Sequence, residues 1–249
     1  MRCAALAAAL TLVAAPAAQA TLINVQFGQN STQFFPATPA YTGAGVLGAA
    51  GDQWNLVLGN FSDSAPRNSL ALTDVLGAAT SVTLGYTGAI GYFDASSSAN
   101  SPLMGSTSYA DLLDAFLYTT GTATFTFSGL TAGASYDLIL YAIANKIGRE
   151  TRVTVDGVTE SVIAAATPGL VLGSTYAELA NVIADPSGHI VIAVQGGLVG
   201  QGSGVEADVN GIQLTESSIA AIPEPASATL FVAGLTLLGW HRLRRSRLT

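Results

Sequence analysis

The sequence predicts an all-β protein, a single jelly-roll-like β-sandwich with one short helix, flanked by an N-terminal signal helix and a C-terminal transmembrane helix. The central part of the 249-residue chain abounds in Thr, Val, Ser, Ala and Gly and is poor in Lys and Glu, which favours strands. Short stretches of alternating apolar and polar residues recur along it, separated by turn-forming residues. Asp156-Gly157, between two such stretches, is typical of a two-residue hairpin.

Nine stretches are predicted to be strands. They are residues 22–27, 55–58, 81–86, 122–127, 136–142, 151–155, 158–163, 189–195 and 211–215. All lie within residues 21–222, a length that can bury one good core, and no linker interrupts this part of the chain. We therefore expect one domain over residues 21–222, after a signal peptide (1–20) and before a C-terminal tail (223–249).

One helix is predicted among the strands, because an apolar stripe with helical spacing runs through this part of the chain. The stripe consists of Tyr109, Leu112, Leu113, Phe116 and Leu117. Ser108 and Asp111 form a Ser-x-x-Asp start that resembles a capping box. We therefore interpret Asp111 as a cap and Asp114 as a surface acid, rather than as a catalytic pair.

The N-terminus has the three parts of a secretory signal. An arginine supplies the positive charge, residues 3–15 are apolar, and Ala18 and Ala20 are the small residues that a signal peptidase reads. We therefore expect export through the Sec machinery and cleavage before Thr21.

The C-terminus combines three features in order. Pro223-Glu224-Pro225 interrupts the chain, residues 226–240 are apolar and uncharged, and a basic cluster follows. A helix over residues 226–240 would rise about 22 Å, short of a hydrocarbon core of about 30 Å, but terminal arginines can snorkel to the membrane surface. The cluster contains Arg242, Arg244, Arg245 and Arg247. It predicts that this end stays in the cytoplasm while the domain lies outside.

This tail resembles the PEP-CTERM sorting tag of Gram-negative bacteria, over residues 223–249. The resemblance implies that Pro223, Glu224 and Pro225 are recognised by an exosortase, a membrane protease that cleaves such tags. It also implies a host that makes exopolysaccharide, and a protein that is held transiently in the inner membrane before it reaches the cell surface or extracellular matrix. The alternative is a plain C-terminal anchor.

Charge limits the partners of the domain. Residues 21–222 carry four basic and fifteen acidic residues, a net charge of −11, whereas the whole chain has −7. This argues against nucleic acid and anionic lipid, and it suits a soluble protein, a neutral glycan or a divalent cation. Cys3, the only cysteine, lies in the predicted signal, so the mature domain has no disulfide.

Two passages resemble known sandwich families. Residues 129–138 resemble the turn and strand of fibronectin-like and galactose-binding-like sandwiches, which implies that a leucine closes the core and that the hydroxyl of Tyr136 pins a corner turn. Residues 206–214 resemble the last strand of malectin-like and related carbohydrate-binding jelly rolls. Both resemblances imply an architecture rather than a ligand.

The domain offers little for catalysis. A Ser-His-Asp triad would have to use the one histidine of the domain, His189, as its base. No serine is placed as its nucleophile, since Gly202-Ser203-Gly204 lacks the strand-turn-helix context of a nucleophile elbow. One histidine without thiols does not make a zinc site. Many acids could form a glycosidase pair, but most lie in turns. We predict no enzyme, no catalytic residue and no cofactor other than a structural calcium.

Two sets of residues are candidates for ligand binding. For a sugar we name Trp54, Tyr92 and Asp94, because neighbouring strand residues point to opposite faces and one of Tyr92 and Phe93 must leave the core. Phe61, Phe93 and Tyr118 are further aromatic candidates. For calcium we name Asp52, Glu206 and Asp208, because hard cations take carboxylate oxygens.

These observations predict an exported, non-catalytic surface or matrix protein, sorted by its tail and retained by exopolysaccharide. A structural or adhesive protein without a ligand site is the first alternative. A glycosidase or lyase acting on polysaccharide is the second.

Overall fold

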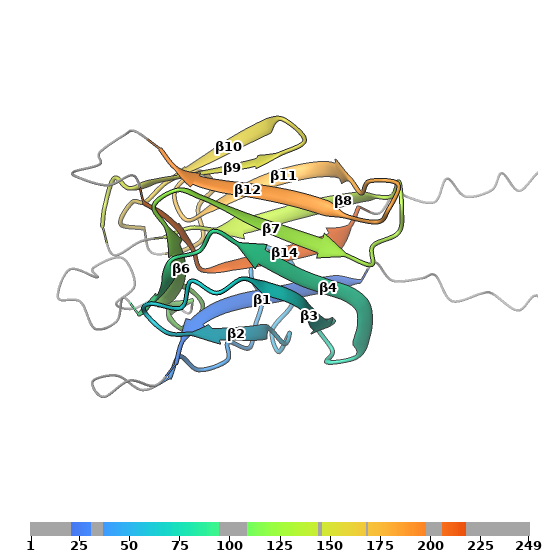
Figure 1. Cartoon of the computed structure of the whole chain (residues 1–249). Coiled ribbons are helices and arrows are strands. Elements are labelled where there is room, and N and C mark those ends of the chain that lie inside the picture. The colour runs from blue at the N-terminus through green and yellow to red at the C-terminus, as the bar shows by residue number, and fades with distance from the viewer. Residues whose placement is uncertain are drawn as a thin grey trace, which may run out of the picture.

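Two β-sheets packed face to face form the body of the protein (Figure 1). The computed structural model describes residues 21–30, 37–94, 109–143, 146–167, 169–197 and 206–217. One sheet contains, in spatial order, β11 (Tyr176–Ile183), β8 (Ser135–Tyr141), β14 (Gly211–Glu216), β1 (Leu22–Gln29) and β2 (Asn55–Gly59). The other contains β10 (Val158–Ile163), β9 (Glu150–Val155), β12 (Ile190–Gly196), β7 (Thr122–Ser128), β4 (Ala79–Thr87) and β3 (Arg67–Thr73). The predicted all-β sandwich with one short helix is confirmed.

A third, smaller sheet adjoins the sandwich. It consists of β13 (Ala207–Val209), β6 (Ala115–Thr119) and β5 (Gly91–Asp94), with β6 in the middle. The short helix α1 (Ala110–Leu113) leads directly into β6. Because β13 is followed at once by β14, this small sheet is tied to the centre of the five-stranded sheet.

The main core lies between the two large sheets and follows from the alternation in their strands. In β7, Ala123, Phe125 and Phe127 are fully buried, while the threonines between them lie on the outer face. The Phe27 ring of β1 contacts the rings of Tyr86 and Phe125, with centroids 5.9 and 5.6 Å apart. Burial of such apolar side chains from both sheets supplies the main driving force for folding.

The other face of the five-stranded sheet is covered by the chain between β1 and β2 and by α1. A second buried cluster forms there, around Trp54, Ile139, Tyr141 and Phe116. Four fully buried amide side chains hold this layer on the sheet, each through two to four hydrogen bonds. They are Asn24, Gln26, Asn210 and Gln213.

Gln213 and Gln26 illustrate how the buried amides bind the covering loop. Gln213 Oε1 accepts hydrogen bonds from Leu47 N (3.0 Å) and the Tyr141 hydroxyl (2.5 Å), and its Nε2 donates to Leu47 O (3.0 Å). Gln26 Oε1 accepts from Tyr41 N (2.8 Å). These bonds satisfy loop backbone groups that would otherwise be buried without partners.

All nine predicted strands are present, within one or two residues of the predicted ends. The predicted hairpin is confirmed as well: Val155 pairs with Val158, and Asp156 and Gly157 both have positive φ, 50° and 80°, as a type I′ turn requires. Five strands were not predicted, namely β3, β5, β6, β11 and β13.

The predicted helix is right in place but wrong in length. It ends at Leu113, and Phe116 and Leu117 belong to β6 instead. Helical spacing gives way here because β6 pairs with both β5 and β13 and thereby buries its apolar residues. The N-cap residue is Tyr109, which makes no side-chain capping hydrogen bond. Ser108, on which the predicted Ser-x-x-Asp cap depends, lies outside the described residues.

The predicted signal peptide and C-terminal tail lie outside the described residues. Within the part of the chain that the structure describes, no helix is both long and apolar enough to cross a membrane.

Candidate functional site

The small sheet β5–β6–β13 has two different faces. Tyr92, Leu117 and Val209 point into the main core. Phe93 and Tyr118 point the other way, where they pack against the second buried cluster and stay partly exposed. The sequence showed that one of Tyr92 and Phe93 must leave the core, and the structure shows that it is Phe93.

Phe61 completes an aromatic cluster on this outer face. It lies just beyond β2, and 54% of its surface is exposed. Its ring centroid is 6.1 Å from that of Phe93 and 5.8 Å from that of Tyr118. The Tyr118 hydroxyl donates a hydrogen bond to the Phe61 backbone oxygen (3.0 Å). Gly91 makes this approach feasible, since a Cβ there would lie 1.9 Å from the same oxygen.

An ionic cluster adjoins the aromatic one. Asp208, only 1% exposed, accepts hydrogen bonds from Arg149 Nη1 at 3.0 and 3.2 Å, and the same nitrogen lies 2.6 Å from Glu206 Oε1. Thr151 Oγ1 accepts a hydrogen bond from the Asp208 amide (3.1 Å), which fixes β13 against β9.

Burial raises the pKa of Asp208 to about 8; the Arg149 guanidinium opposes this shift and the neighbouring Glu206 carboxylate reinforces it. Two carboxylates share one guanidinium here, so the pair keeps a proton above the ordinary carboxyl range.

The two clusters lie side by side. Asp208 and Tyr118 are direct register partners in the antiparallel pair of β13 and β6. Burial, and then the charge of Glu206, raise the pKa of Tyr118, which places Glu206 within electrostatic reach of that ring. The surface thus combines the exposed Phe61 ring with the carboxylate of Glu206, whose side chain is 27% exposed, and with the mostly buried guanidinium of Arg149, whose side chain is 12% exposed. We call this set, Phe61, Phe93, Tyr118, Arg149 and Glu206, the aromatic–ionic surface.

The residues named from sequence for sugar binding occupy other positions. Trp54 is 6% exposed, its Nε1 donates to Gly43 O (2.9 Å), and its ring packs against Tyr141. Tyr92 is fully buried, and its hydroxyl is hydrogen-bonded to that of Tyr86. Asp94 is 6% exposed. Neither ring offers an open face in this structure, so sugar binding through Trp54 or Tyr92 stays a prediction that would require the ring to move.

The residues named for calcium are only partly brought together. Glu206 and Asp208 both bind Arg149. Asp52 lies elsewhere, in the layer that covers the five-stranded sheet, where its Oδ2 accepts a hydrogen bond from Ala49 N (2.8 Å). Within the described ranges, no three or more His, Cys, Asp or Glu side chains gather as a metal site would need. Arg149 supplies positive charge to both acids. It was not predicted as a site residue, because no motif in the surrounding sequence indicates such a role.

The remaining polar candidates have structural partners. His189 Nδ1 lies 3.5 Å from Asp185 Oδ2 inside one turn, and Asp185 Oδ1 also accepts from the Ser187 and His189 amides. Asp137 Oδ1 accepts from Asn181 N (3.0 Å). These acids satisfy turns and strand irregularities, as acids in loops commonly do. The Gly202-Ser203-Gly204 stretch lies outside the described residues.

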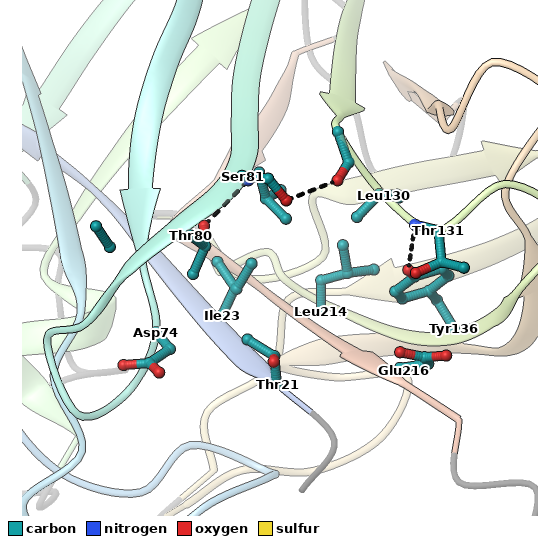
Figure 2. A pocket seen from close by; sticks show the side chains of 13 residues that line it. Thr21, Ile23, Asp74, Thr80, Ser81, Leu130, Thr131, Tyr136, Leu214 and Glu216 are labelled. Carbon is teal, nitrogen blue, oxygen red and sulfur yellow. Dashed lines mark hydrogen bonds between the residues drawn. The ribbon is translucent and has the colours of Figure 1, made fainter. Parts of the chain in front are cut away.

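A cavity of about 280 Å³ opens at the end of the sandwich where β1 begins and β14 ends (Figure 2). Its wall includes the corner turn, where the Thr131 amide donates to the Tyr136 hydroxyl (3.0 Å), as the resemblance implied. Ile23 and Leu214 form an apolar floor (Figure 2). The acid Asp74 already accepts hydrogen bonds from the Leu76 and Ala78 amides. This cavity offers no exposed ring, and we assign it no ligand.

No family model matches the chain, and no curated protein matches it. Solved structures similar to it include receptor ectodomains and carbohydrate-binding modules. The ANX2 ectodomain from Arabidopsis thaliana is 11% identical, with a TM-score of 0.44, and the match covers 79% of this chain and 49% of that one. A family 35 carbohydrate-binding module from Clostridium thermocellum is 16% identical, with a TM-score of 0.29, covering 53% and 90%.

TmCBM61, solved in complex with β-1,4-galactotriose, is 15% identical, with a TM-score of 0.27, and the match covers 55% of this chain and 83% of that one. The chain spans 32% to 49% of the length of two Arabidopsis ectodomain structures that it matches. With identities and TM-scores this low, the function of the chain has to be argued from its own residues.

Proposed function

We propose that this chain is an exported, non-catalytic matrix protein whose β-sandwich binds neutral exopolysaccharide at the aromatic–ionic surface. The observation that carries the proposal is the exposed Phe61 ring, held against Tyr118 next to the Arg149–Glu206 pair. An aromatic face provides apolar contact area for the C–H face of a sugar ring. The partly exposed Glu206 carboxylate, which Arg149 holds in place, supplies acceptors for hydroxyl groups.

Two features support a neutral ligand. The net charge of −11 over residues 21–222 repels polyanions. Arg149 and Glu206 nearly cancel each other's charge, so the surface itself attracts neither anions nor cations strongly.

The proposed route to the outside uses both ends of the chain. Signal peptidase would cleave after Ala20, and an exosortase-like protease would act at Pro223-Glu224-Pro225 after the segment 226–240 has entered the inner membrane. The pairing of Leu22 with Thr215 is compatible with this route, because it places the first and last described residues of the domain at the same end of the sandwich. Intact mass of the protein from the secreted and membrane fractions of the native host tests it: we expect a mass that begins at Thr21 and ends near Pro223. Surface protein that retains residues 226–249 would contradict the sorting step.

Glycan binding is tested by electrophoresis of the full-length chain through gels that contain soluble neutral polysaccharides, with β-1,4-galactan, xylan and dextran as probes. The detergent must lack a sugar headgroup, since such a headgroup would compete. We expect retardation by at least one probe, and a roughly tenfold weaker affinity for Phe61→Ala, as for a central aromatic contact.

Phe61→Ala removes the ring but keeps the backbone oxygen that Tyr118 binds, so the fold should survive. Leu76→Ala is the matched control, because Leu76 is also exposed and apolar but lies in the turn beyond Asp74. Equal retardation of Phe61→Ala and wild type would rule out the aromatic–ionic surface as the site.

A self-associating structural protein is the second candidate. Within the described residues, β10 pairs only with β9 and β11 only with β8, and Val158 and Ile183 on these edge strands are exposed. Unpaired edges with exposed apolar residues favour strand addition between copies. Sedimentation of the full-length chain tests this: a dimer that Val158→Lys dissociates would favour it, and a monomer would exclude it.

A further inference from the structure

A hydroxyl-lined groove crosses the outer face of the six-stranded sheet. Its volume is about 220 Å³. Its polar lining comes from β3, β4 and β7. The side chains concerned are those of Asn68, Ser69, Thr83, Thr124, Thr126 and Ser128.

The register of the sheet sets these side chains in rows. Thr83 pairs with Ser128, Gly85 with Thr126, and Thr87 with Thr124. Residues between them, such as Leu84, point into the core, so the row residues all face outward. Gly85, in the middle of the rows, has no side chain, which lets the backbone of β3 approach it.

Strand β3 forms the wall of the groove. Its pairing with β4 shifts register between Arg67 and Leu70, and Ser69 there has a φ of 53°, which is uncommon for a residue other than glycine. The strand bends toward Gly85 at this bulge: a Cβ on Gly85 would lie 3.3 Å from Arg67 O and 3.8 Å from Ser69 N. A strained bulge that shapes a concave surface is a feature that functional sites often retain.

The polar groups of the groove are available to a ligand. Throughout the described ranges, the side chains of Asn68, Ser69, Thr83, Thr124 and Thr126 make no hydrogen bond within the protein, unlike Thr154 and Thr159 on the same face, which bond to each other (2.8 Å). Each threonine hydroxyl can donate one hydrogen bond and accept two.

The groove also differs from the rest of the domain in charge. Its lining contains no charged residue, although residues 21–222 carry a net charge of −11. It therefore holds no fixed charge that would attract a cation or bind a phosphate. Free hydroxyls and methyl groups in a narrow, uncharged groove fit a ligand that is itself rich in hydroxyls and uncharged.

We propose that this groove is a second binding site, specific for a neutral polysaccharide chain and built from other residues than the aromatic–ionic surface; its role in a matrix rests on the proposed function. Two sites on different sheets would allow one molecule to connect two glycan strands, which would raise its retention in a matrix by avidity.

Threonine-methyl NMR of the full-length Phe61→Ala chain, in a detergent without a sugar headgroup, tests the proposal, since this background weakens the other site. The probes are neutral hexasaccharides of glucose, galactose and mannose, with oligogalacturonate as the charged control. We expect the methyl signals of Thr83, Thr124 and Thr126 to shift with at least one neutral probe and not with oligogalacturonate. Thr154 and Thr159 should not shift.

A matched pair of variants completes the test. Thr83→Val with Thr126→Val removes two groove hydroxyls without changing shape, and we expect about tenfold weaker binding of the neutral probe. Thr154→Val with Thr159→Val removes two hydroxyls from the same face outside the groove and should bind normally. The proposal is overturned if no neutral probe shifts the groove threonines, if oligogalacturonate shifts them equally, or if the groove variants bind the neutral probe as tightly as their parent.

Discussion

Replacing Asn210 with alanine tests how the small sheet is held in place. The Asn210 side chain is fully buried. Its Oδ1 accepts a hydrogen bond from Ile143 N (2.6 Å), and its Nδ2 donates to Leu113 O (2.9 Å) and Ala115 O (3.0 Å). Alanine removes all three bonds and leaves no polar atom to replace them. The start of β6 would lose its link to the five-stranded sheet.

The magnitude follows from those three groups. A buried donor or acceptor without a partner costs about 1–3 kcal/mol, and a carbonyl that keeps another bond costs less. We therefore expect the free energy of unfolding to fall by about 3–5 kcal/mol, a large share of the stability of a typical domain. With a denaturant slope of about 2 kcal/mol per molar, the urea midpoint would drop by about 2 M.

Urea unfolding of the full-length chain, followed by circular dichroism, measures this change. Asn60→Ala is the control, because Asn60 is exposed and its side chain makes no hydrogen bond in the described ranges. Asn210→Asp should also destabilise, since it places a carboxylate oxygen against two carbonyl oxygens. A loss below about 1 kcal/mol for Asn210→Ala, no larger than for the control, would refute the role assigned to this amide.

Three further predictions concern other parts of the structure. Tyr136→Phe removes the hydroxyl that binds the Thr131 amide and should cost about 1 kcal/mol in thermal unfolding, whereas an unchanged midpoint would show that the corner does not need it. Gly91→Ala would place a Cβ 1.9 Å from Phe61 O, so calorimetry should show lower stability together with weaker glycan binding; loss of neither would contradict the close approach. Because the pKa of Asp208 is raised in the folded state, the native protein holds this proton more tightly than the unfolded chain does. The free energy of unfolding should therefore fall as pH rises from about 4 to about 8, by more than about 1 kcal/mol, and Asp208→Asn should flatten that profile. Identical profiles for both proteins would contradict it.

The spacing of apolar residues along the chain predicted the strands that alternate regularly. It failed where tertiary contacts determine the secondary structure. The stripe from Tyr109 to Leu117 has helical spacing, yet its second half is β6 because it is paired on both sides. Strand β11 was missed because a bulge between Leu179 and Val182, with Asn181 at a φ of 59°, breaks its period of two. Strand β13 has only three residues, too few for any pattern.

The aromatic residues of the candidate site could be named from the sequence, but the contacts that bring the site together could not. Alternation showed that Tyr92 or Phe93 must leave the core, but only the pairing with β6 decides which one. Arg149 meets Glu206 and Asp208 from positions 57 and 59 residues away, a contact that no local pattern encodes. The buried amides were missed for the same reason, because their partners lie up to 189 residues apart in the chain.

Calorimetric titration of the full-length chain with exopolysaccharide purified from the native host, in parallel with Phe61→Ala, tests glycan binding at the aromatic–ionic surface most directly. We expect saturable binding by the wild type, weakened about tenfold when the exposed Phe61 ring is lost. No binding by the wild type, or equal binding by both proteins, would contradict the claim that the aromatic–ionic surface holds this protein in a glycan matrix.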